Sequence, residues 1–119
     1  MNTSAFQKPF FGFLFYDSPH NYNLPYWLPH PFKPYWENVD HTVLNNDFDP
    51  VPFYNSYKNT VWFCDSLIQQ VLSKLEEKNL LENTIVVITS DHGQEFNENK
   101  KIIGDIPAIF PNTNFRFLV

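Results

Sequence analysis

The chain has 119 residues, a length that allows one domain at most. Hydrophobic residues make up 43% and charged residues 18%, which excludes an ordinary disordered tail. The net charge of -5 excludes a nucleic-acid-binding protein of the usual basic kind. No apolar run reaches the roughly 18 residues that cross a bilayer, and residues 1–4 do not open a signal peptide. Expressed alone, the chain is therefore expected in the cytoplasm.

The first element expected along the chain is a buried strand over residues 10–16. This segment is apolar on both alternations, which is typical of a strand covered on both faces. Such a strand belongs in the centre of a parallel sheet.

A long loop rich in aromatic residues and proline is expected over residues 17–52. The segment carries most of the ten prolines of the chain. Because proline fixes φ and removes a backbone donor, no long regular element fits there. His30 and His41 lie in this loop without a partner at a ligand spacing, and we assign them no role.

Apolar residues then recur at spacings of three and four, which predicts an amphipathic helix over about residues 57–78. The apolar positions are Val61, Cys64, Ile68, Val71, Leu72 and Leu75. Lys78 and Asn79 favour the end of a helix at that point. A β-branched run at Ile85–Ile88 predicts a second buried strand over residues 84–89.

Strand, helix and strand in this order predict a βαβ unit with a right-handed crossover. We therefore expect an α/β fold with a mostly parallel sheet, in which the apolar stripe of the helix faces the sheet. The aromatic and proline-rich loop would join the first strand to the helix.

A polar cluster follows the second predicted strand. Asp91 and His92 leave that strand directly and are followed by Gly93. Ligands bind at the carboxyl ends of parallel strands, and carboxylate and imidazole donors suit Zn²⁺ or Mn²⁺, with Mg²⁺ less favoured. A metal-binding pair is one interpretation of this cluster. A polar turn in which Asp91 binds nearby backbone is the other.

His20 occupies the equivalent place after the first predicted strand. If the two strands are parallel, His20 reaches the same edge of the sheet as Asp91 and His92. The alternative is a solvated or packed loop histidine with no role as a ligand.

Three stretches of the chain carry a resemblance to a known family. They are Phe15-Tyr16-Asp17-Ser18-Pro19-His20, Tyr57 to Leu72, and Leu80 to Phe96. Their order and spacing resemble the sulfatase branch of the alkaline phosphatase superfamily, over about residues 8–100. Within that branch the chain is similar to the periplasmic sulfatase-like domain of YejM (PbgA)-type inner-membrane proteins, which are linked to envelope lipid homeostasis.

The resemblance implies that Asp91 and His92 are metal ligands and that His20 contacts a sulfate or phosphate group. It implies Zn²⁺, Mn²⁺ or Mg²⁺ as the cofactor, and a phosphate ester, sulfate ester or lipid as the partner. Family members carry a nucleophile and further acidic ligands on segments that would precede Met1. Cys64 does not replace that nucleophile, because its surroundings lack the Cys-x-Pro-x-Arg pattern that formylglycine conversion requires. Weak or no metal binding is therefore expected of this chain alone.

The tail departs from the family after residue 101. Family members continue with a Trp-Gly-His segment that supplies another site histidine, whereas this chain reads Ile102-Ile103-Gly104-Asp105. Codons can be chosen for residues 101–119 that encode Asn-Tyr-Trp-Gly-His-Thr-Ser-Asn-Phe when they are read one nucleotide earlier. We expect residues 1–101 to be a fragment of a sulfatase-like domain and residues 102–119 to be an out-of-frame tail.

The leading hypothesis is a fragment of a metal-dependent phosphate or sulfate ester hydrolase or transferase, inactive alone. The alternative is a non-catalytic regulatory or lipid-interacting module of an inner-membrane protein. Either would meet the membrane only through a domain missing from this chain. A small independent binding protein is a third hypothesis, disfavoured because exposed rings at this density promote aggregation.

Overall fold

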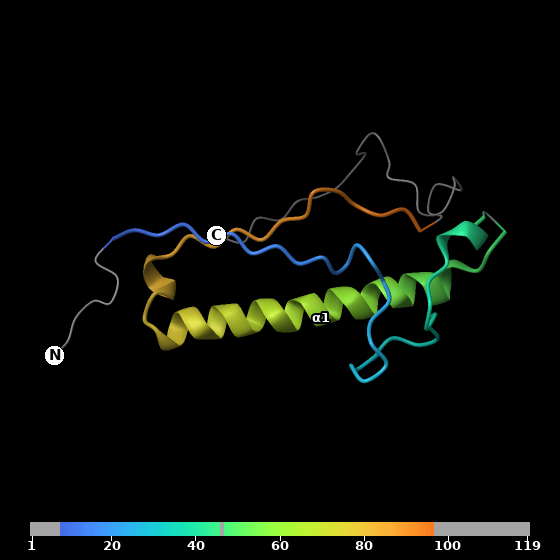
Figure 1. Cartoon of the computed structure of the whole chain (residues 1–119), viewed down its shortest axis with the longest axis horizontal. Coiled ribbons are helices and arrows are strands. Elements are labelled where there is room, and N and C mark those ends of the chain that lie inside the picture. The colour runs from blue at the N-terminus through green and yellow to red at the C-terminus, as the bar shows by residue number, and fades with distance from the viewer. Residues whose placement is uncertain (1–7, 46, 97–119) are drawn as a thin grey trace.

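The computed structural model describes residues 8–45 and 47–96 (Figure 1). These residues form the short 3-10 helix η1 (His41–Val43), the long α-helix α1 (Pro50–Glu77) and the 3-10 helix η2 (Leu81–Asn83). Across them no helix combines the length and the hydropathy that a bilayer crossing needs. The expected out-of-frame tail, residues 102–119, and its boundary at residue 101 lie outside the described residues.

Helix α1 begins at Pro50, earlier than the predicted start near residue 57. The Asp49 carboxylate accepts a hydrogen bond from the Val51 N–H at 3.0 Å and caps the first turn. Proline is tolerated in this turn because the first N–H groups of a helix have no partner inside it. The last residues of the predicted loop, 50–52, therefore belong to the helix.

The end of α1 lies where the sequence predicts it. Glu77 is the last helical residue and Asn79 adopts a left-handed φ of 54°, which asparagine tolerates better than most residues. The Leu80 N–H donates to the Leu75 carbonyl at 2.9 Å, and the Asn79 N–H donates to the Glu76 carbonyl at 2.8 Å. These two bonds form a Schellman motif that satisfies the terminal carbonyls.

The buried face of α1 is polar where it meets the aromatic and proline-rich loop. We call Asn55, Ser56 and Asn59 the polar ladder; all three are buried. Asn59 accepts from the Phe32 N–H at 3.0 Å and donates to the Phe32 carbonyl at 3.1 Å. These contacts pair backbone groups of the loop with side chains of the helix.

The other two members of the polar ladder continue this pairing along the loop. The Asn55 amide donates to the Pro34 carbonyl at 2.8 Å. Ser56 Oγ accepts from the Trp36 N–H at 2.9 Å. The polar ladder thus replaces, for this loop, the backbone pairing that a neighbouring strand would provide.

An aromatic core lies beside the polar ladder, over the first turns of α1. Its centre is the fully buried Phe53, whose ring centroid is 5.2 Å from that of Tyr22 and 5.5 Å from that of Phe96. The partly buried residues packed against this centre are Trp36, Val39, Leu44, Phe48, Tyr57 and Phe96. The core therefore joins the aromatic and proline-rich loop, helix α1 and the segment after η2 that contains Phe96.

The predicted apolar stripe of α1 is covered only in part. Cys64 is buried, whereas Val61 is 40% exposed. The remaining stripe positions are half-buried: Ile68, Val71, Leu72 and Leu75. In the first half of the helix the buried residues include Phe53, Ser56 and Thr60. Ser56 and Thr60 are polar, so a search for apolar spacing cannot identify them.

The prediction of two strands is wrong for the part of the chain that the structure describes. Residues 10–16 and 84–89 are extended, but neither forms a strand. Their outward side chains are exposed: Phe11 is 91%, Phe13 78% and Ile85 93% accessible. A parallel strand needs cover on both faces and further strands beside it, and one helix cannot provide these.

The chain nevertheless follows the course of a βαβ unit. In Figure 1 the segments 8–20 and 84–96 both run from the η2 end of α1 toward the end where α1 begins, while α1 runs the opposite way. Contacts of Tyr22 and Phe96 with Phe53 place the far ends of both segments on the first turns of the helix. The order and direction of the α/β prediction are present, but the described residues 8–45 and 47–96 form no sheet.

Replacing Asn59 with leucine should destabilise the chain. Asn59→Leu leaves the Phe32 N–H and carbonyl without their partner, and an unsatisfied buried group of this kind costs about 2 kcal/mol. Urea unfolding followed by far-ultraviolet circular dichroism measures the loss. Gln69→Leu, on the exposed face of α1, should change the free energy of unfolding by less than about 0.5 kcal/mol; equal effects would contradict the role of the polar ladder.

The exposed rings of residues 10–16 should make the chain self-associate. Phe11→Ser/Phe13→Ser/Phe15→Ser should reduce both self-association in sedimentation and binding of a hydrophobic dye, with little change in helix content, because these rings are largely exposed. Tyr26→Ser/Trp27→Ser removes exposed rings elsewhere and is the matched control. If the control pair reduces self-association more than the triple substitution does, the extended segment is not the surface through which the chain associates.

Candidate functional site

Asp91 lies at a bend of the chain, and two local hydrogen bonds involve it and His92. The His92 N–H donates to Asp91 Oδ1 at 3.1 Å, and His92 Nδ1 lies 2.7 Å from the Gly93 carbonyl oxygen. Since a carbonyl only accepts, Nδ1 carries the hydrogen in this contact. In the neutral ring the lone pair is therefore on Nε2, which lies 3.9 Å from Asp91 Oδ1.

The donor atoms of this pair lie near the separation that one divalent cation requires. Two ligand atoms that are each about 2.1 Å from a tetrahedral zinc ion lie about 3.4 Å apart, so the Nε2–Oδ1 separation of 3.9 Å would have to shorten by about 0.5 Å. A backbone carbonyl that accepts from the other ring nitrogen is a common outer partner of metal-binding histidines. Asp91 is exposed and His92 half-buried, so both are open to solvent on one side.

The polar-turn alternative shares this geometry. Asp91 does accept a hydrogen bond from nearby backbone, as that alternative expects. Among residues 8–45 and 47–96, no group of three or more His, Cys, Asp and Glu side chains is placed to hold a metal ion. Metal binding by Asp91 and His92 therefore stays a prediction.

His20 lies in a turn at the end of the first extended segment. The His20 N–H donates to the Asp17 carbonyl at 2.8 Å, which closes the turn. Cys64 Sγ donates to the Ser18 carbonyl at 2.9 Å and ties the turn to α1. The His20 side chain is exposed, and its contact with an anionic group stays a prediction.

A hydrogen bond connects the two segments that carry these residues. The Tyr22 hydroxyl donates to Gln94 Oε1 at 2.5 Å. Tyr22 is two residues beyond His20, and Gln94 is two residues beyond His92. The ends of the two segments therefore meet, as parallel strands were expected to do. Sequence reasoning missed Tyr22 and Gln94, because neither lies at a spacing typical of a site.

Burial sets the electrostatics of the residues that hold the segments together. Burial, and then the neighbouring Tyr57, raise the pKa of the Tyr22 hydroxyl well above its usual value. Burial also raises the pKa of the Cys64 thiol. Both groups therefore stay protonated and act as hydrogen-bond donors near neutral pH.

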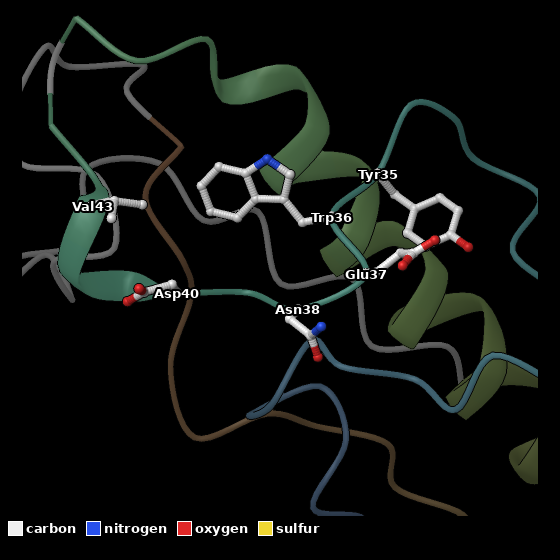
Figure 2. A pocket seen from close by; sticks show the side chains of 6 residues that line it. All are labelled: Tyr35, Trp36, Glu37, Asn38, Asp40 and Val43. Carbon is white, nitrogen blue, oxygen red and sulfur yellow. The ribbon is translucent and has the colours of Figure 1, made fainter.

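A separate hollow of about 290 Å³ lies on the aromatic and proline-rich loop. Figure 2 shows its lining, with Tyr35 and Glu37 on one side and Asp40 and Val43 on the other. Hydrogen bonds from the Thr42 hydroxyl and then from the Thr42 N–H lower the pKa of the Asp40 carboxyl. None of the site residues predicted from the sequence lines this hollow.

Comparison with known proteins identifies the class of the chain. The sulfatase family model matches residues 2–117, so the chain belongs to the sulfatase family. The chain is also 29% identical over 85 residues to the protein named phosphoethanolamine transferase EptA of Helicobacter pylori (strain ATCC 700392 / 26695). That alignment covers 71% of this chain and 15% of the relative, so the chain spans a small part of that protein. No solved structure matches the chain.

The family membership confirms the resemblance seen in the sequence, at the level of the sulfatase family. The narrower similarity to the YejM branch is not shown by these matches. The division of the chain at residue 101 is not tested by them either, and it stays a prediction.

Alkaline pH should destabilise the chain through its buried tyrosines. Burial raises the pKa of Tyr22 and of Tyr57 above the ordinary 10.0, so the folded state favours the neutral phenols. This stabilisation is present below pH 10.0 and is lost as the pH rises above it. The free energy of unfolding in urea, measured from neutral pH upward, should fall more steeply in the wild type than in Tyr22→Phe. Tyr26→Phe, which alters an exposed ring, should keep the wild-type profile.

Proposed function

We propose that the chain is a piece of a metal-dependent phosphate or sulfate ester transferase or hydrolase domain. The observation that carries this proposal is the geometry of Asp91 and His92, where Gly93 holds Nδ1 and leaves Nε2 facing the carboxylate. Membership of the sulfatase family supports the same chemistry. The similarity to a protein named as a phosphoethanolamine transferase favours a phosphate ester, and the resemblance seen in the sequence adds a lipid as one carrier of it.

In this proposal Asp91 and His92 bind the metal, and His20 binds the substrate. Asp91 supplies carboxylate oxygens and His92 supplies Nε2, a donor set that suits Zn²⁺ or Mn²⁺ better than Mg²⁺. When bound, a divalent ion polarises the ester oxygen and activates a nucleophile. The His20 imidazole, at the end of the neighbouring segment, donates a hydrogen bond to the anionic group of the ester.

The chain alone should bind metal weakly and turn over no ester. Asp91 and His92 are two donors, whereas a catalytic zinc site has three protein ligands and a water. Residues 102–119, as an out-of-frame tail, would not supply the family's further histidine. Any membrane contact would come through another domain, as proposed from the resemblance.

Mn²⁺ titration followed by NMR tests the metal pair. Mn²⁺ should broaden the ring-proton signals of His92 first and those of His20 at higher concentration, because broadening falls with distance. Asp91→Asn removes a carboxylate ligand and should weaken the apparent Mn²⁺ affinity at least about tenfold. Glu82→Gln makes the same charge change on an exposed residue of η2 and should leave the affinity unchanged.

Two outcomes would contradict the proposal. Equal broadening of His92 in Asp91→Asn and Glu82→Gln would show that Asp91 is not a ligand, and would favour the regulatory or lipid-interacting alternative. Metal-dependent cleavage of an aryl phosphate or aryl sulfate, lost in Asp91→Ala/His92→Ala, would show instead that the chain alone is active.

A further inference from the structure

Tyr22 is the residue through which the aromatic core reaches the segment of the candidate site. Its hydroxyl donates to Gln94 Oε1 at 2.5 Å, and its side chain is only 5% exposed. The bond spans 72 residues of sequence. It joins the end of one extended segment to the end of the other.

The Tyr22 ring is fixed by its neighbours on α1. Its centroid lies 5.2 Å from that of Phe53 and 5.3 Å from that of Tyr57. Burial keeps the Tyr22 hydroxyl protonated, and the Gln94 amide has no titratable proton. The bond is therefore maintained near neutral pH.

Gln94 is linked to His92 through a single residue. Gly93 lies between them, and its carbonyl oxygen is 2.7 Å from His92 Nδ1. Anchoring Gln94 therefore restrains the Gly93 carbonyl, which in turn sets the tautomer of His92 and the direction of Nε2.

We infer that Tyr22 is a positioning residue for the Asp91–His92 pair and acts through the Gln94 side chain and the Gly93 carbonyl. The metal part of this inference rests on the proposed function. The restraint on the His92 ring does not, because it exists without a metal.

The test uses the full chain and two NMR measurements on His92. Tyr22→Phe keeps the ring in the core and removes the donor. The ratio of the Nε2–H to the Nδ1–H tautomer, read from ring nitrogen shifts, should rise about fivefold, as expected for the loss of one hydrogen bond. The apparent Mn²⁺ affinity should fall about tenfold. Gln94→Leu should reproduce both changes, and the double variant should add nothing further.

Tyr57→Phe is the matched control, because it removes a hydroxyl from the same aromatic core without touching Gln94. It should leave both measurements unchanged. If Tyr22→Phe loses its helix signal, Gln94→Leu decides the question, since it leaves the core rings intact.

An unchanged tautomer ratio in Tyr22→Phe and Gln94→Leu would overturn the inference, and so would additive effects of the two substitutions. If the ratio changes as expected while wild-type chain binds no Mn²⁺, positioning of His92 by Tyr22 stands and the proposed metal function fails. The experiment therefore distinguishes failure of the positioning inference from failure of the proposed metal function.

Discussion

The polar ladder on α1 is the constraint on which the rest of the structure depends. A loop with this many prolines cannot supply the donors that a sheet needs, and buried backbone groups without partners are costly. Asn55, Ser56 and Asn59 meet that need with side chains. The ladder places Trp36 beside Phe53, and the core that forms there receives Tyr22 and Phe96. The meeting of the two extended segments follows from this packing.

Local features of the chain could be predicted from the sequence, and features that depend on distant partners could not. The end of α1 depends on Lys78 and Asn79, which are next to each other, and it was predicted. The start at Pro50 was missed because proline can both exclude a helix and open one. The strands were predicted from apolar runs at residues 10–16 and 84–89, but a strand also needs neighbours that a sequence pattern does not report.

In the candidate site, too, the local feature could be predicted from the sequence and the distant contact could not. The Asp91–His92 pair and its place after an extended segment were evident from the sequence. Tyr22 and Gln94, which join that segment to the core, were not, because their contact spans 72 residues of sequence and has no spacing to mark it. The polar-turn and metal-pair interpretations also prove to be compatible. Asp91 accepts a hydrogen bond from the His92 N–H, as the polar-turn interpretation expects, while the contact of Nδ1 with the Gly93 carbonyl leaves the lone pair of His92 on Nε2.

The hydrogen bonds between α1 and the aromatic and proline-rich loop affect which side chains of the loop can be substituted. In the part of the chain that the structure describes, the hydrogen bonds from the ladder to the loop go to main-chain atoms of residues 32, 34 and 36, and at Pro34, which has no N–H, to the carbonyl. Recognition of the main chain is largely indifferent to the side chains that it carries. The rings of Phe32 and Trp36 also contact α1, at Lys58 and at Phe53. Side chains can therefore change without a matching change in the helix chiefly at the neighbouring positions Tyr35 and Glu37. The helix thus fixes the path of the loop backbone, and the side chains at these positions set the chemistry of the loop surface.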